Sequence, residues 1–338
     1  MPEDTILIGH GAGGKLSRDL INQVFIKHFN NSELSKLDDC SLVNTTSKTA
    51  FTTDSYVIDP IIFPGGDIGK LAVSGTVNDL LVGGAIPQYL SAGFILEEGL
   101  PIEILEQIVA SMAKEARKAH VKIITGDTKV VKKGQCDKLF INTAGIGKGM
   151  EEASHLWEPP VFNIGDKVIV SGYLGDHATT ILAARNNISF EQELVSDVAP
   201  LNNLIIPLME DYSTSVKFMR DITRGGLATI LNELCDEKTF GIKLQETNIP
   251  VKNEVIGICE IFGYDPLYLA NEGKVMLVVE ENAAQAVLEK MRSSDLGKDA
   301  AIVGEITKSG AGRVHLESVI GGSRIVDMLS GEMLPRIC

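Results

Sequence analysis

The sequence is poor in aromatic residues and in cysteine, which argues against several classes of protein. Aromatic side chains make up 5% of its 338 residues, whereas glycine occurs 33 times. This composition favours an α/β enzyme with many tight loops over an aromatic-rich binding module. The five cysteines are odd in number and widely spaced, without a CxxC pair. The sequence therefore predicts neither a disulfide framework nor a zinc site.

Long apolar runs and basic clusters are also lacking. No segment reaches the roughly 20 apolar residues of a membrane span, and the opening residues MPEDTILIGH form no basic leader. Lys and Arg number 31 against 45 Asp and Glu, a formal net charge of −14. We therefore expect a cytoplasmic protein that binds neither nucleic acid nor membranes.

The chain is long enough for two hydrophobic cores. Strand and helix patterns mix without strict alternation, which predicts an α+β or mixed α/β fold. The clearest helix pattern covers residues 102–120, and paired prolines beside the single tryptophan indicate a boundary at 154–166. We expect an N-terminal domain over 1–155, a C-terminal α/β domain over 156–328, and a mobile tail over 329–338.

Glycine-rich and acidic segments are the candidates for chemistry. The segment GHGAGGK (9–15) fits two phosphate-loop patterns loosely, as a lid over phosphates or as a flexible glycine arm. Five aspartates stand among small residues, and each alone fits an Asx turn or a helix cap. Together they resemble the hard oxygen ligands of a magnesium triphosphate site. They are Asp54, Asp67, Asp79, Asp127 and Asp221.

Three basic residues stand near these aspartates in the sequence and could offset phosphate charge: Lys70, Lys129 and Arg224. The chain also closes on PRIC, so its last residue, Cys338, carries both a thiol and the terminal carboxylate. An exposed thiol is normally avoided. Cys338 is thus either an accident of where the chain stops or a functional group.

Four segments together resemble the HypE family of hydrogenase maturation proteins. They are FTTDSYVIDPIIFPGGDIGKLAVSGTVNDLLVGGA (51–85), TGDTKVV (125–131), RDITRGGL (220–227) and PRIC (335–338). The first three are similar to a wider ATP-binding superfamily that includes aminoimidazole ribonucleotide synthetase, selenophosphate synthetase and thiamin monophosphate kinase. The terminal PRIC distinguishes HypE from these relatives.

The resemblance implies a two-domain fold, with N-terminal strands that pair across a homodimer, an ATP site near that interface and a C-terminal α/β domain over it. It also implies a carbamoyl dehydratase. In that family the partner HypF loads a carbamoyl group onto the terminal cysteine. ATP then drives its dehydration to a thiocyanate, and the cyanide passes to iron on the HypC and HypD assembly.

The same resemblance assigns roles to individual residues. Magnesium is expected at Asp54, Asp79 and Asp127, and the catalytic residues are expected to be Cys338, Lys129, Glu272 and Arg224, with Asn271 as a further orienting residue. The expected ATP-binding residues are Asp54, Gly65, Gly66, Asp67, Lys70, Asn78, Asp79, Gly126, Asp127 and Thr128.

The chemistry explains why such residues are needed. The oxygen of an S-bound carbamoyl group is a poor leaving group, so ATP must phosphorylate it before loss of the nitrogen protons expels phosphate and forms C≡N. Lys129 is expected on the transferring phosphoryl group or the carbamoyl oxygen. Glu272 is the candidate base, although a lone glutamate before glycine is also a common turn residue.

The terminal carboxylate should raise the pKa of the Cys338 thiol, and Arg336 is expected to offset part of that effect. The ten residues from Leu329 to Cys338 span roughly 33 Å when extended, enough to move the thiol between an outer and an inner position.

Two other functions also fit the sequence. A free-substrate synthetase of the same superfamily would use the ATP aspartates but has no need of a terminal thiol. A nucleotide-sensing scaffold would use the tail as a docking peptide. An ATPase assay with and without a carbamoylated tail separates the three.

Overall fold

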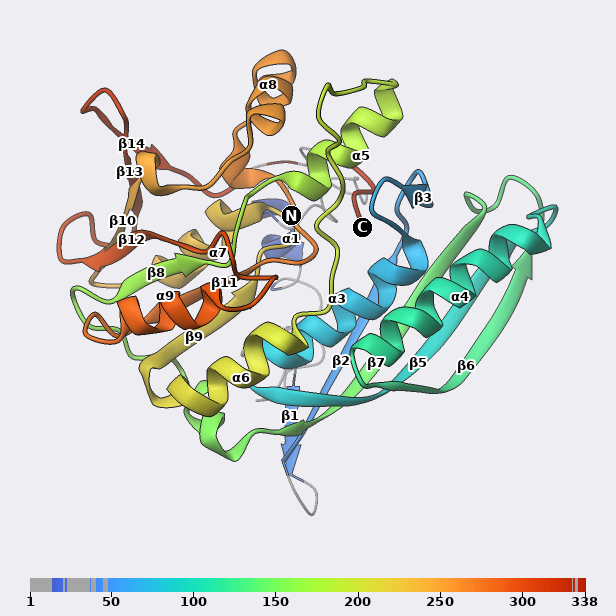
Figure 1. Ribbon diagram of the computed structural model, residues 1–338, viewed down its shortest axis with the longest axis horizontal. Helices are drawn as coiled ribbons and strands as arrows, with labels where there is room; N and C mark the ends of the chain where they lie inside the picture. The colour runs from blue at the N-terminus through green and yellow to red at the C-terminus, as the bar shows by residue number, and fades with distance from the viewer. Residues whose placement is uncertain are drawn as a thin grey trace.

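The computed structural model describes residues 14–20, 22, 37, 41–44, 48–329, 331 and 334–338. Its N-terminal half holds a five-stranded sheet, drawn in blue to green in Figure 1. In spatial order the strands are β1 (Ser41–Asn44), β2 (Lys48–Tyr56), β7 (Leu139–Gly149), β5 (Ala85–Glu97) and β6 (Lys122–Val131). Helices α3 (Ile68–Val82) and α4 (Ile102–Lys118) lie over one face of this sheet. The shorter elements are α1 (Lys15–Leu20) and the hairpin of β3 (Ile62–Phe63) and β4 (Gly66–Asp67).

No described helix covers the other face of the five-stranded sheet. Burial alternates along β2 and β7, as it does in strands with one face on a core. Phe51, Ile146 and Tyr89 stand opposite one another in register across β2, β7 and β5. They are 46%, 38% and 40% exposed. A row of large apolar side chains on an open sheet face is typical of a surface that another chain covers.

The C-terminal half holds a seven-stranded sheet covered on both faces. In spatial order its strands are β14 (Ser323–Val326), β13 (Val314–Glu317), β10 (Gly241–Gln245), β12 (Ala301–Thr307), β8 (Lys167–Val170), β11 (Val275–Val279) and β9 (Val216–Asp221). Its helices are α5 (Asp176–Asn186), α6 (Asn202–Tyr212), α7 (Gly226–Cys235), α8 (Asn253–Phe262) and α9 (Ala284–Arg292). The 3-10 turns among the described residues are η4 (Glu151–Trp157), η5 (Ser213–Ser215), η6 (Glu246–Asn248) and η7 (Pro266–Tyr268).

Successive residues of β8 enter two different cores. Val168 and Val170 pack with α7, whereas Ile169 joins the apolar side chains of α5, α6 and α9. That second core continues into α3 of the N-terminal half. The two halves therefore share one large apolar core, with α3 lying between them (Figure 1).

The predicted mixture of helices and strands is confirmed. The helix pattern over residues 102–120 corresponds to α4. The sequence patterns predict no element at β9, β10, β13, β14, α8 or α9. Among the helices that the structure describes, none combines the length and the apolar character that a membrane crossing requires.

Helix α3 packs unusually closely on β2 because Gly75 has no side chain. A Cβ at this position would lie 2.3 Å from the hydroxyl oxygen of Tyr56, much closer than the atoms can approach. Tyr56 is 2% exposed and its hydroxyl donates to Asp54. Gly75 therefore fixes the distance between α3 and the strand that carries Asp54.

We expect Gly75→Ala to lower the free energy of unfolding by about 1–3 kcal/mol, because either the helix or Tyr56 must move. The matched control is Gly257→Ala in α8, where an added Cβ meets nothing within 4 Å. The control should stabilise by about 0.5–1 kcal/mol through helix propensity. Urea unfolding of both variants measures this, and equal effects of the two substitutions would contradict the packing argument.

Candidate functional site

The C-terminal tail packs against the chain with Pro335 exposed and Ile337 buried, and the carbonyls of residues 335–337 and one carboxylate oxygen of Cys338 each accept a hydrogen bond. Arg185 donates to Pro335 O at 2.7 Å and to Arg336 O at 2.5 Å. The ring of His177 contacts Ile337 O at 2.8 Å, and the backbone N–H of Val57 donates to Cys338 O at 3.0 Å. The side chain of Ile337 is buried in the shared core.

This docking places the Cys338 thiol among charged groups. Burial raises its pKa to about 12, the neighbouring Arg224 guanidinium opposes this rise, and Glu272, Asp54 and Asp221 add to it. At neutral pH the docked thiol is therefore protonated, and a protonated thiol is a poor nucleophile.

Strand register explains how residues distant in the sequence meet here. Asp221 ends β9 and pairs with Val275, which begins the antiparallel neighbour β11. The chain leaving β9 therefore runs beside the chain entering β11, and Asn271 N donates to Ile222 O at 2.9 Å. Arg224 follows β9 and Glu272 precedes β11, so the register brings the two together.

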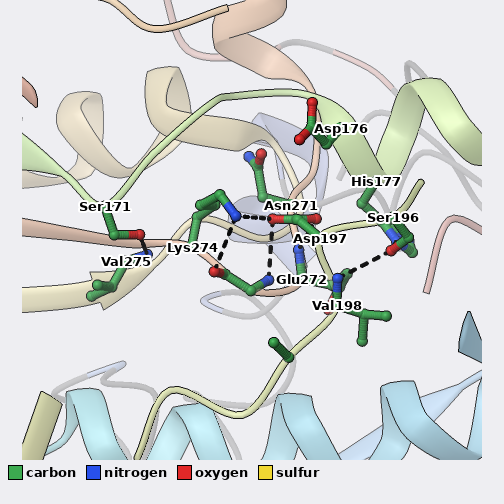
Figure 2. A network of polar contacts seen from close by, with 12 residues as sticks. Ser171, Asp176, His177, Ser196, Asp197, Val198, Asn271, Glu272, Lys274 and Val275 are labelled. Atoms are coloured by element: carbon green, nitrogen blue, oxygen red, sulfur yellow. Dashed lines mark hydrogen bonds and ion pairs between the residues drawn. The ribbon is translucent and has the colours of Figure 1, made fainter. Parts of the chain in front are cut away.

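Glu272 is a buried carboxyl held by its main chain. The side chain is 4% exposed, and its Oε1 has no hydrogen-bond partner. Figure 2 shows Asp197 beside it. The Asp197 carboxylate accepts from the N–H groups of Glu272 and Gly273 at 3.1 and 3.3 Å and pairs with Lys274 at 3.3 Å. Burial, then the carboxylates of Asp221, Asp197 and Asp54, raise the pKa of Glu272 well above its usual range, and Arg224 lowers it.

Asp54 and Asp79 approach the site from the N-terminal half. Asp54 Oδ2 accepts from Tyr56 Oη at 3.0 Å, and Asp79 Oδ2 accepts from Thr52 Oγ1 at 2.9 Å. Burial, then the charges of Asp54 and Asp79, raise the pKa of Tyr56 well above its usual value. Asp54 of β2 therefore shares a sheet face with Thr52 and Tyr56, and Asp79 of α3 contacts that face through Thr52.

Asp127 does not lie with Asp54 and Asp79 in the same chain. Pairing runs from Asp54 to Thr143, from Thr143 to Ala92 and from Ala92 to Gly126, so Gly126 shares the sheet face of Asp54. Asp127 and Lys129 belong to the opposite, uncovered face, because side chains alternate along a strand. Gly126, Asp127, Thr128 and Lys129 are all exposed.

The expected convergence of three aspartates is thus not found within a single chain. Two strands separate β2 from β6, and the described residues contain no group of three or more His, Cys, Asp or Glu side chains suited to a metal. Lys129 is likewise not brought to Cys338 of its own chain. If Asp127 and Lys129 act in catalysis, they act at the site of a second copy.

The PGGD segment has structural contacts in this conformation. Asp67 caps α3, accepting from Gly69 N and Lys70 N at 2.8 and 2.9 Å, as the helix-cap alternative predicts. Lys70 donates to Gly65 O at 2.9 Å. A Cβ on Gly65 or Gly66 would come within 2.9 Å of residues 196–198.

The side chain of Asn78, which the sequence predicts at ATP, is bonded within the chain. Its side chain is 2% exposed, donates to Ala199 O at 3.1 Å and accepts from Leu201 N at 2.9 Å. Both polar ends are occupied by the chain itself, which ties α3 to the segment before α6.

Arg336 does not have its expected role beside the thiol. Its Nε donates to Val57 O at 3.0 Å and its guanidinium pairs with Asp137, while Arg224 is the cation that lowers the pKa of Cys338. Cys136, Cys235 and Cys259 are buried and free. Cys40 and residues 9–13 of the glycine segment lie outside the described residues.

His177 and Arg185 are the contact residues that sequence reasoning missed. Both lie on α5 and both bind main-chain carbonyls of the tail. Such contacts depend on no side chain of the tail, so no pairing of motifs in the sequence could have revealed them.

Comparison with known proteins first defines the class. Residues 37–148 match the AIR synthase related protein N-terminal domain, and residues 163–317 match the C-terminal domain of the same family. These two domains fit the two sheets described above, and the predicted AIR synthase-like fold is confirmed.

Full-length relatives then identify the family. The chain is 47% identical over 342 residues to "Carbamoyl dehydratase HypE" of Rhodobacter capsulatus, covering 99% of both chains. A crystal structure of a HypE–HypF complex superposes with a TM-score of 0.84 at 46% identity, over 92% of this chain and 99% of that one. A HypE structure in complex with ATP gives 0.80 at 45% identity, over 99% and 100%. The chain belongs to the carbamoyl dehydratase HypE family.

The raised pKa of Glu272 predicts a pH-dependent stability. The folded state holds this proton more tightly than an unfolded glutamate with a pKa of about 4.3. Its contribution to stability is therefore complete below that pH and is lost as the pH rises through the folded-state pKa.

Glu272→Gln cannot ionise, so its stability relative to the wild type should rise between pH 5 and pH 9, by about 1–3 kcal/mol. Urea unfolding across this range measures the difference. Glu260→Gln, at an exposed residue of α8, is the control and should follow the wild type. A constant offset between Glu272→Gln and the wild type would show that Glu272 is not protonated in the folded protein.

Proposed function

We propose that the protein dehydrates a carbamoyl group carried on Cys338 to a thiocyanate at the expense of ATP, supplying the cyanide ligand of a nickel-iron hydrogenase. The observation that carries this proposal is the docked tail, which sets the Cys338 thiol beside Arg224, Glu272 and Asp54. A free-substrate synthetase has no use for this arrangement. Identity of 47% to a carbamoyl dehydratase over the full length supports the same choice.

The reaction balances with the groups present. The γ-phosphoryl group moves from ATP to the carbamoyl oxygen, which breaks the bond to ADP and forms a C–O–P linkage. Nitrogen then loses its two protons, the C–O bond breaks, and inorganic phosphate leaves as C≡N forms. The products are the S-cyano group, ADP and phosphate, with the elements of water retained in the phosphate and the released proton.

Each residue of the site has a role in this scheme. Glu272 accepts a nitrogen proton, and its raised pKa makes it a stronger base than an ordinary carboxylate. Arg224 offsets the negative charge that develops on the phosphorylated oxygen. Asn271 is buried, and its Oδ1 accepts from Gly175 N at 2.8 Å, which holds the loop before Glu272 against α5.

Magnesium fits the residues of the N-terminal half. Mg²⁺ is commonly held by one or two carboxylates together with substrate phosphates and waters, and Asp54 of β2 and Asp79 of α3 supply two carboxylates where these elements pack together. When bound there, the ion neutralises phosphate charge. The proposal needs no third aspartate from the same chain.

We further propose that a second copy covers the open sheet face. The exposed row of Phe51, Ile146 and Tyr89 gives that face an apolar surface, and Asp127 and Lys129 lie on the same side of the sheet. HypF is the proposed carbamoyl donor, in line with the HypE–HypF complex, and the HypC and HypD assembly is the proposed cyanide acceptor.

The test measures the mass of the C-terminal peptide during the reaction. After incubation with HypF, carbamoyl phosphate and ATP, we expect Cys338 first to gain the mass of a carbamoyl group and then to lose that of water. The controls are Cys338→Ala, which should gain nothing but still bind ATP, and omission of ATP, which should stop the reaction at the carbamoyl stage. Labelling of Cys136, Cys235 or Cys259 instead would overturn the proposal.

A mixed dimer tests whether Lys129 serves the partner's site. Lys129→Ala and Glu272→Gln homodimers should each accept carbamoyl and fail to dehydrate it. A dimer with one chain of each kind contains one site with both native residues if Lys129 acts across the interface. Differently tagged chains purified as this mixed dimer should therefore regain about half of the wild-type rate. Absence of recovery would place Lys129 outside the partner's site.

A further inference from the structure

Helix α5 presents two donors to consecutive carbonyls of the tail. His177, in its first turn, reaches Ile337 O at 2.8 Å, and Arg185, in its last turn, reaches Pro335 O and Arg336 O at 2.7 and 2.5 Å. Arg185 Nε also donates to Asp59 O at 2.6 Å. One guanidinium thus ties the tail to both α5 and the segment after β2.

The proton of His177 has one consistent position. A carbonyl oxygen only accepts, so Nε2 must donate to Ile337 O. Ser196 Oγ accepts from Val198 N at 3.2 Å and lies 2.7 Å from His177 Nδ1 (Figure 2). Burial lowers the pKa of the ring and so favours its neutral form, in which Nε2 carries the proton and Nδ1 accepts from the Ser196 hydroxyl.

His177 is enclosed, which fits a fixed donor rather than a proton carrier. It is 0% exposed, and Phe63 packs edge-on against its ring with centroids 5.6 Å apart. Burial lowers the pKa of the ring, which keeps it in the neutral form that Ser196 and Ile337 require.

The tail binds through its main chain. Pro335 is exposed, and the carbonyls of residues 335–337 are each taken by a side chain of α5. Arg336 has a left-handed backbone with φ of 54°, a conformation that non-glycine residues adopt only at some cost. The contacts on both sides of this residue hold it there.

We propose that α5 is a docking site for the C-terminal main chain, in which Arg185 and His177 act as positioning residues that hold Cys338 beside Glu272 for dehydration and release it for loading. The role rests on the proposed function. The hydrogen bonds of Arg185 and His177 to the tail do not rest on it, so docking and catalysis are tested separately.

Alkylation of Cys338 measures docking without any catalysis. The docked thiol has a pKa of about 12, whereas a free thiol has about 8.5, so a neutral alkylating reagent at pH 8 reacts mainly with the undocked tail. Chain cleavage before Asp327 releases the C-terminal peptide for mass spectrometry. The buried Cys136, Cys235 and Cys259 report any general unfolding.

We expect Arg185→Ala and His177→Leu to raise the alkylation rate of Cys338 about tenfold or more, because each removes bonds to the tail whose loss is not compensated. His177→Gln is the conservative rescue, since its amide can donate to Ile337 O and accept from Ser196. It should stay within about threefold of the wild type. Arg292→Ala, which removes another arginine bound to a carbonyl, Ala300 O at 2.9 Å, is the control and should leave the rate unchanged.

The two half-reactions then separate positioning from folding. With HypF, Arg185→Ala should load carbamoyl at least as fast as the wild type, yet dehydrate it about tenfold more slowly at saturating ATP. Unchanged alkylation in Arg185→Ala and His177→Leu would overturn the docking site, whatever the catalytic result. If the two variants are alkylated faster but the wild type forms no thiocyanate, the docking site is retained and the proposed function is rejected. A loss of loading equal to the loss of dehydration would overturn the positioning role.

Discussion

An excess of negative charge around one guanidinium is the constraint on which the site depends. Of the four charged groups that act most on the Cys338 thiol, Arg224 is the cation and Glu272, Asp54 and Asp221 are acidic. One guanidinium offsets only part of this negative charge, and an uncompensated charge in the interior is costly. The surplus of negative charge therefore raises the pKa of both Glu272 and the thiol, so each holds its proton more tightly than the free group does.

In the proposed reaction, this constraint separates loading of Cys338 from dehydration in space. A docked, protonated thiol is a poor nucleophile for an activated carbamoyl donor, so loading belongs to the undocked tail. Once the sulfur carries a carbamoyl group it no longer ionises, and docking costs less electrostatic energy than docking a thiolate. The acidic groups that disfavour a thiolate at the docked position therefore favour docking once the sulfur has been carbamoylated.

Sequence reasoning identified the groups of this site better than their arrangement. The motifs around Asp54, Arg224, Glu272 and Cys338 were sufficient to predict residues that the structure brings together. The face of β6 could not be predicted, because a strand exposed on both sides shows no alternation, and only register assigns Asp127 and Lys129 to the uncovered face. Arg185 and His177 contact main-chain carbonyls, so the side chains of the residues they bind give no sequence signal for these contacts. Short strands such as β13 and β14, each of four residues, carry too few positions for a periodic pattern.

The tail is bound through its main chain. The carbonyls of Pro335, Arg336 and Ile337 and one carboxylate oxygen of Cys338 each have a donor, and buried polar groups without partners are costly. These bonds set the thiol beside Asp54 and Glu272 without using the side chains of Pro335 or Cys338. Undocking of the tail therefore breaks these bonds together with the contacts of Ile337 and Arg336.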